Sequence, residues 1–260
     1  MTEKVEGIVL TVQDYGETSR ILNVITKEYG VIGIIAKGCK SIKSKLRSCT
    51  DKLTYGYFHI HYKKDKLSIL TNVDIIDNFK NIKKDIDKIS YASYLLELSG
   101  QVIKHSYKEG IYDLLINGLI KINEDYDPLV IMNIIELKYL DYLGVMPVID
   151  ACCKCGKTTS ICTLSSYAGG YLCNSCRTNE IIVSDKTIKL LRMFYYVDLS
   201  KISKIEVSNE AKNEINSFLD EYYDRYTGLY LKSKNFINNL NKLKCWDFKI
   251  KTVFLNCFYL

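Results

Sequence analysis

Residues 152–176 read CCKCGKTTSICTLSSYAGGYLCNSC, and this stretch carries the most specific pattern in the chain. Cys152 and Cys155 form one C-x-x-C pair, and Cys173 and Cys176 form a second. A C-x-x-C turn brings two thiolates to one side of a backbone knuckle, so two such turns can complete a tetrahedral sulfur shell around Zn²⁺. The spacing therefore predicts a zinc ribbon with these four cysteines as ligands.

Cys153 is an alternative ligand to Cys152, although C-x-C spacing places two sulfurs less naturally than C-x-x-C does. Cys162, between the two pairs, is expected to be a core or surface thiol. A catalytic zinc keeps an open coordination position, whereas four sulfurs close the shell. The H-x-E motif of zinc deaminases does not occur in the sequence. We therefore expect the zinc to be structural.

The overall composition is that of an ordinary globular protein. The chain has 260 residues, 47% hydrophobic and 25% charged, with a net charge of +6. This length predicts two domains. The sequence has neither a signal-peptide pattern at its start nor a run of about 18 uncharged apolar residues, so we expect a cytoplasmic protein without a membrane span.

Ten cysteines in such a protein do not predict a disulfide framework. Four of them lie outside the ribbon, and we expect them to be inert or buried thiols. These are Cys39, Cys49, Cys245 and Cys257.

The first eighty residues alternate apolar and polar side chains with many β-branched and aromatic residues, which predicts strands. The five predicted strands cover residues 5–12, 19–26, 31–36, 53–62 and 67–76. Five short strands joined by tight turns favour a small closed barrel of the oligonucleotide-binding (OB) type.

After residue 80 the apolar period changes from two to about 3.6, which predicts helices. The predicted helices cover residues 82–102, 111–122, 128–143, 185–197 and 208–227. The third is apolar nearly all round, so we expect it at the centre of the bundle. The predicted class is α+β, with an OB-type barrel at 1–79, a helical domain at 80–243 carrying the zinc insertion at 148–182, and an atypical tail at 244–260.

A basic segment, residues 37–47, lies between the third and fourth predicted strands and contains five cations and no acid. A flexible cationic loop beside an open β-face can neutralise phosphates without reading bases. The alternative is that the loop is simply solvated. Tyr55, Tyr57 and Phe58 are either stacking faces for bases or core residues. The candidate DNA-binding cations are Arg20, Lys37, Lys40, Lys43, Lys45, Arg47, Lys63 and Lys64.

Several segments resemble the bacterial recombination mediator family RecO. They run in the family's order over about residues 1–235. They are Gly7–Leu10, Asp14–Arg20, Thr26–Gly30, Ala36–Gly38, Leu143–Pro147, Cys152–Gly156, Gly169–Cys173 and Leu229–Ser233. The tail departs from the resemblance, because it extends past the family's usual end and finishes in an apolar run at 253–260.

The resemblance implies an N-terminal OB barrel, a helical domain with an inserted zinc ribbon, and a role in recombinational repair. It also implies binding to single- and double-stranded DNA, annealing of strands coated by single-strand-binding protein, and help in loading recombinase RecA together with RecR. The family's DNA-contacting surface falls by position on residues 37–47. Its members are cytoplasmic, associate with the nucleoid and are not enzymes.

The family acts without a nucleotide cofactor, which agrees with the absence of a G-x-x-x-x-G-K-[ST] phosphate loop from the sequence. The alternative function is a zinc-ribbon helical scaffold that docks proteins and has no direct DNA activity.

Overall fold

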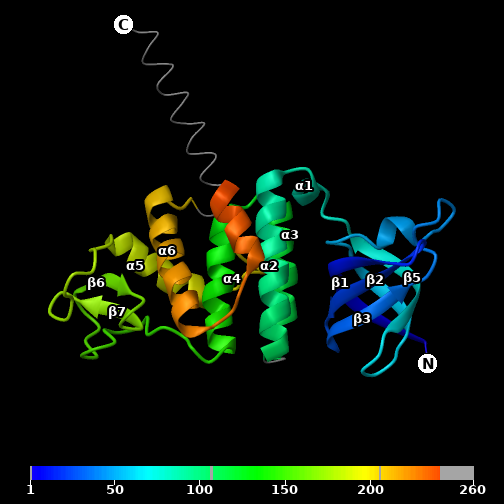
Figure 1. Ribbon diagram of the computed structural model, residues 1–260. Coiled ribbons are helices and arrows are strands. Elements are labelled where there is room, and N and C mark those ends of the chain that lie inside the picture. The colour runs from blue at the N-terminus through cyan, green and yellow to red at the C-terminus, as the bar shows by residue number, and fades with distance from the viewer. Residues whose placement is uncertain (1, 106–107, 205, 241–260) are drawn as a thin grey trace, which may run out of the picture.

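The computed structural model describes residues 2–105, 108–204 and 206–240. Three parts follow one another across the molecule (Figure 1). A strand-built N-terminal part lies at one end, a group of helices lies in the middle, and a small two-stranded part lies at the other end. The arrangement confirms the α+β class. The helices lie between the first eighty residues and the cysteine segment.

The N-terminal part is a five-stranded barrel. Its strands are β1 (Thr2–Tyr15), β2 (Ser19–Thr26), β3 (Gly30–Ala36), β4 (Tyr55–His61) and β5 (Ser68–Asp77). Each strand pairs with two neighbours in the order β1-β2-β3-β5-β4, and β1 pairs with β4 to complete the ring. The one parallel contact, between β3 and β5, spans two residue pairs. Apolar side chains such as Val9, Leu22 and Phe58 fill the interior and are fully buried. The predicted OB-type architecture is thus confirmed.

The link from barrel to helices differs from the sequence expectation. Instead of one helix over 82–102, the chain forms a short α1 (Lys80–Lys83) and a long α2 (Ile86–His105). The carboxylate of Asp85 accepts hydrogen bonds from the backbone N–H groups of Asp87 and Lys88. A side chain that takes up these free amides starts a new helix, so the break follows from a local capping bond.

The other helices are α3 (Ile111–Asn123), α4 (Pro128–Tyr142), α5 (Asp185–Tyr196) and α6 (Asn209–Tyr226). Helix α4 is buried along most of its length, as its all-round apolar sequence predicts. Its N-terminus is capped by Asp127, which accepts from two backbone amides, and Pro128 occupies the first turn. Ser184 and Ser208 cap α5 and α6 in the same way.

The barrel packs on α2 and α3. Gly100 of α2 lies against Leu10, so closely that a Cβ there would come within 2.8 Å of the Leu10 side chain. The Tyr112 hydroxyl donates to Glu6 at 3.4 Å, and Lys27 pairs with Asp113 of α3 at 3.4 Å. Apolar side chains of β1 and β2 join the helical core, so the two parts share one continuous hydrophobic contact.

The small part at the far end is a ribbon built on β6 (Ile161–Ser165) and β7 (Gly170–Cys173), which pair antiparallel. None of the helices in the described residues is long and apolar enough to cross a membrane. The tail predicted at 244–260 lies outside the described residues.

Candidate metal centre and candidate nucleic-acid interface

The four cysteines of the two C-x-x-C pairs converge in the ribbon. The Sγ atoms of Cys152, Cys155, Cys173 and Cys176 all lie within 4.8 Å of one another. Cys155 and Cys173 approach to 3.6 Å. A tetrahedral zinc site with Zn–S bonds of about 2.3 Å sets its sulfurs about 3.8 Å apart, so this group fits a metal ion. Cys153 is not in the group, which leaves Cys152 as the first ligand of the quartet.

The knuckles that present these thiols are closed by backbone hydrogen bonds. Gly156 N–H donates to the Cys152 carbonyl at 2.9 Å, and Cys176 N–H donates to the Cys173 carbonyl at 3.0 Å. Gly156 has a positive φ of 73°, which a residue with a Cβ rarely adopts. Burial disfavours the Cys152 thiolate, but hydrogen bonds from the backbone of Cys173 and Cys155 outweigh it and lower the Cys152 pKa to about 6. The first knuckle therefore favours the ionised Cys152 sulfur that a metal requires, whereas the hydrogen bond with Cys155 raises the pKa of Cys176 to about 12.

The ribbon is held firmly against the helices. Gly170 has a φ of 151°, and a Cβ there would lie 2.2 Å from the Val148 carbonyl oxygen, so only glycine fits. Tyr171 N–H donates to that carbonyl at 2.8 Å, and the Tyr171 hydroxyl donates to the Ile188 carbonyl of α5 at 2.6 Å. The Ser166 hydroxyl donates to Glu221 of α6 at 2.7 Å. Helix packing thus stabilises the same small part that carries the four thiols.

The thiols outside the cluster have packing roles. Cys39 and Cys49 are buried against the barrel core, and Cys162 is buried and donates to the Leu172 carbonyl at 3.7 Å. This agrees with the expectation of inert thiols. Cys245 and Cys257 lie outside the described residues.

The basic segment 37–47 is anchored to the barrel at both ends. Cys39 and Cys49 insert into the barrel core, and Leu46 packs against it. The Lys40 N–H donates to the Thr18 carbonyl at 2.9 Å, and successive turns over residues 38–49 are closed by backbone hydrogen bonds. The expectation of a freely flexible loop is wrong, because buried side chains and backbone bonds fix its path.

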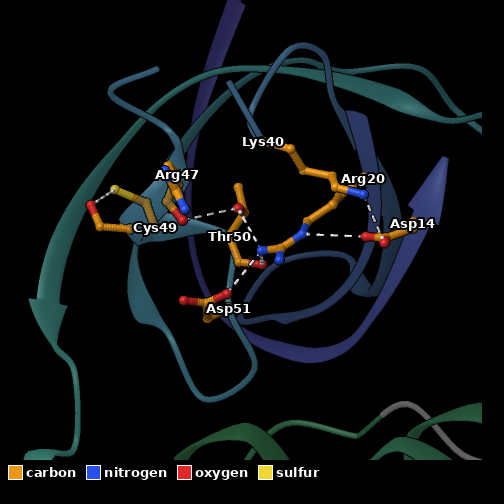
Figure 2. A network of polar contacts seen from close by, with 8 residues as sticks. Asp14, Arg20, Lys40, Arg47, Cys49, Thr50 and Asp51 are labelled. Carbon is orange, nitrogen blue, oxygen red and sulfur yellow. Dashed lines mark hydrogen bonds and ion pairs between the residues drawn. The ribbon is translucent and has the colours of Figure 1, made fainter. Parts of the chain in front are cut away.

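Figure 2 shows the polar network at the base of this segment. Arg20 pairs with Asp51 at 2.8 Å and with Asp14 at 3.5 Å, and it also donates to Thr50 at 3.4 Å. Lys40 pairs with the other oxygen of Asp14 at 2.8 Å. This hydrogen bond from Lys40 lowers the pKa of Asp14, whose carboxylate stays charged.

Two of the candidate DNA-binding cations are therefore engaged within the protein. Arg20 and Lys40 join β1, β2 and the segment after β3 through the two aspartates. The sequence pattern did not reveal these aspartates as partners, since no local spacing links Asp14 to Asp51. The two aspartates become partners of these cations only because the folded barrel brings the segments together.

The remaining cations of the segment face solvent. Lys37, Lys43, Lys45 and Arg47 are all exposed, and within the described residues none of their side chains forms an ion pair. The structure brings these four together on one short anchored loop. Such a loop presents positive charge whose position is fixed before any ligand arrives.

Lys63 and Lys64 belong to a different surface. Arg20 pairs in register with Ala36, and Tyr15 pairs with Ser19, which places segment 37–47 where β1 ends. Thr2 pairs with His61, which places the turn after β4 where β1 begins. In Figure 1 this turn is the cyan hairpin tip at the lower edge of the barrel. The two groups of cations therefore lie at opposite ends of β1.

The candidate stacking residues are mostly core residues. Phe58 is fully buried, and Tyr55 is buried with its hydroxyl donating to Glu6 at 2.6 Å. Tyr57 is half-buried under the ammonium group of Lys4, which lies 4.4 Å from the ring centroid. Two of the three are thus buried in the core, and the third already holds a cation over its ring, so the charged loop is the main support for the nucleic-acid hypothesis.

Comparison with known proteins supplies the family. The model of the recombination protein O N-terminal domain matches residues 1–79, and that of its C-terminal domain matches residues 83–235. The chain belongs to the RecO family. The DNA repair protein RecO of Listeria monocytogenes serotype 4b (strain CLIP80459) is 35% identical over 253 residues, which cover 96% of this chain and 98% of the relative.

The DNA repair protein RecO of Bacillus pumilus (strain SAFR-032) is also 35% identical, over 94% of this chain and 96% of its own. That of Bacillus cytotoxicus (strain DSM 22905) is 35% identical over 94% of this chain and its entire length. The two matched RecO domains meet where β5 ends and α1 begins. The resemblance seen in the sequence motifs is confirmed.

Proposed function

We propose that this RecO-family protein acts in DNA repair and recombination by binding single- and double-stranded DNA through the exposed cations of segment 37–47. We further propose that it anneals complementary strands and assists the loading of RecA together with RecR. Family membership supports the repair role. The single observation that carries the DNA contact is the anchored loop with four unpaired exposed cations.

The chemistry of this loop suits phosphate better than bases. Lysine and arginine side chains that are free of internal ion pairs can replace condensed counterions on a nucleic-acid backbone. Residues 37–47 themselves contain no aromatic side chain that could stack on bases, so contacts made by the loop are expected to tolerate any sequence. Four phosphate contacts to a single strand predict a slope of log affinity against log salt of about −3.

The four cysteines are proposed to hold zinc in a structural role, because four thiolates at tetrahedral spacing match its preferred ligand set. A bound zinc would brace the ribbon and supply no open position for substrate. The protein is proposed to act without catalysis, and RecR and single-strand-binding protein are proposed partners on the basis of the family.

The experiment compares two triple variants with matched charge change. The loop variant is Lys43→Gln, Lys45→Gln and Arg47→Gln, and the control is Lys63→Gln, Lys64→Gln and Lys66→Gln at the other end of β1. Affinity for a mixed-sequence oligonucleotide is measured by anisotropy at several salt concentrations. The loop variant is expected to bind at least about 10-fold more weakly, with a salt slope reduced by about 2.

The control is expected to change affinity by less than about twofold, and strand annealing should follow the same pattern. Equal losses in the two variants would overturn the assignment to the loop. Unchanged DNA binding in the loop variant would have the same effect. Absence of DNA binding in the wild-type protein, with binding to RecR retained, would favour the scaffold function instead.

A further inference from the structure

A groove of about 810 Å³ runs between the ribbon and α6. One wall is the face of α6 from Glu210 to Arg225, and the other is formed by the end of β6 and by residues 178–183. The groove belongs to neither the thiol cluster nor the basic loop. It lies at the far end of the molecule from the barrel, where β6 and α6 are seen side by side (Figure 1).

The α6 wall is one regular stripe. Seven α6 residues line the groove at helical spacing: six have polar or charged side chains, and one is a buried aromatic residue. Glu210, Glu214, Phe218, Glu221 and Arg225 all line it. At a rise of about 1.5 Å per residue, the stripe is about 22 Å long. An extended peptide of about seven residues has the same length.

The groove is acidic. Glu180, Glu210, Glu214 and Glu221 line it with one cation, Arg225, and the Arg225 guanidinium is stacked 5.1 Å from the Tyr167 ring centroid. Among the described residues, none of the four glutamates forms an ion pair with lysine or arginine. Backbone hydrogen bonds, first from Thr178, lower the pKa of Glu180 to about 2. The groove lining thus carries four carboxylates against one cation, an excess of negative charge.

The rim is apolar and open to solvent. Ile181 is 83% exposed and Tyr167 is 78% exposed, and both line the ribbon wall of the groove. Single exposed apolar residues are common on protein surfaces, but here two large ones flank a charged groove. A partner that placed aliphatic side chains on this rim would gain hydrophobic contact, and its cations would meet the glutamates.

We propose that this groove docks an extended lysine- or arginine-rich segment of a partner protein that also carries aliphatic side chains. The length of the stripe, the unbalanced acids and the exposed rim all match that chemistry. The proposal is independent of DNA binding by the barrel, since the two surfaces are of opposite charge and lie at opposite ends of the molecule.

The test uses the full chain and a fluorescein-labelled peptide of alternating lysine and leucine, about seven residues long. The groove variant combines Glu210→Lys with Ile181→Ser, because neither side chain forms a hydrogen bond or an ion pair among the described residues. The control combines Asp224→Lys, on α6 outside the groove, with Ile86→Ser, at the exposed start of α2. Both variants change net charge equally.

Anisotropy is expected to show peptide binding to the wild type, a loss of at least about 10-fold in the groove variant, and less than about twofold in the control. The same peptide with glutamate in place of lysine should not bind. Equal affinity of all three proteins, or an equal loss in both variants, would overturn the proposal, because binding would then reflect overall charge. A wild type that self-associates through this face, detected as a smaller sedimenting species in the groove variant, would also overturn it by assigning the groove to a second copy of the chain.

Discussion

At the residue scale, Arg20 joins three segments that are distant in sequence. Its guanidinium contacts Asp14 on β1 and both Thr50 and Asp51 at the end of the basic segment. Lys40 strengthens the cluster through the same Asp14 carboxylate. A cation used in this way positions the loop, while the exposed cations farther along the loop remain free for phosphate.

Replacing Arg20 with methionine is expected to loosen this anchor. Asp14 and Asp51 would lose their shared partner, and the free energy of unfolding should fall by about 1 kcal/mol, since the pairs are partly exposed to solvent. Amide hydrogen exchange over residues 38–50 should become faster in the folded protein. Exchange measured by mass spectrometry checks this.

The matched control is Arg47→Met, on the same segment. The Arg47 side chain forms no ion pair among the described residues, so its removal should leave amide exchange unchanged while weakening DNA binding. If Arg20→Met left loop exchange at the wild-type rate, Arg20 would not be the anchor.

At the element scale, the segment after α6 is fastened to three helices. Glu97 of α2 accepts from the backbone N–H groups of Lys232 and Ser233 at 3.1 and 2.9 Å. Lys234 enters the bundle and pairs with Glu136 of α4 at 2.8 Å and with Asp220 of α6. The Leu229–Ser233 segment of the RecO resemblance lies directly before this inserted lysine.

The buried charges in this contact are balanced only while Lys234 is present. Glu136 is fully buried, and the Tyr94 hydroxyl also donates to it. Burial opposes the charge on Lys234, but Glu136 and Asp220 outweigh it and raise the Lys234 pKa. A raised lysine pKa stabilises the fold below the usual value of 10.5, and this stabilisation is lost as pH rises through the higher folded value.

Lys234→Met is expected to lower the free energy of unfolding by about 3–5 kcal/mol, because it leaves Glu136 buried without a counter-charge. Urea denaturation followed by circular dichroism measures the loss. Lys232→Met, two residues earlier and exposed, serves as the control and should stay within about 0.5 kcal/mol of wild type.

Adding Glu136→Gln to Lys234→Met should recover part of the lost stability, since it removes the isolated charge. A double variant as unstable as the sum of the two single variants would contradict a coupled pair.

At the scale of the whole molecule, the thiol cluster and the basic loop lie at opposite ends, with the helices between them (Figure 1). The ribbon is tied to α5 and α6 by Tyr171 and Ser166, while the loop depends on the barrel. Loss of metal should therefore destabilise the ribbon end and leave the charge arrangement of the loop intact.

Removal of the metal by a chelator is expected to lower the melting temperature, because ligation contributes folding free energy. Each kcal/mol lost corresponds to a shift of about 2–4 °C for a chain of this size.

Cys155→Ser should reduce both metal content and melting temperature, whereas Cys153→Ser should change neither. Metal content is measured by elemental analysis and melting by calorimetry, and DNA affinity of the metal-free protein should stay near that of the holoprotein. Unchanged melting in a sample proved free of metal would contradict the structural role.

Local patterns were enough to predict most of the elements. Period-two and period-3.6 apolar spacing located the strands and helices, and the predicted helix starts at 128, 185 and 208 lie at or next to the capping residues Asp127, Ser184 and Ser208. The break before α2 does not follow from the apolar period, which continues across Asp85, because it depends on the capping hydrogen bonds that this side chain accepts.

The sequence by itself determined the α+β class, the barrel, the family resemblance and the two knuckles that carry the thiols. All of these depend on residues a few positions apart or on motifs in a fixed order. Only the tertiary structure decided that Cys152 and not Cys153 completes the quartet, that Arg20 and Lys40 are internally paired, and that Lys63 and Lys64 face the other end of the barrel. These outcomes depend on strand register and on contacts between residues that are far apart in the sequence. Local spacing in the chain does not predict such contacts.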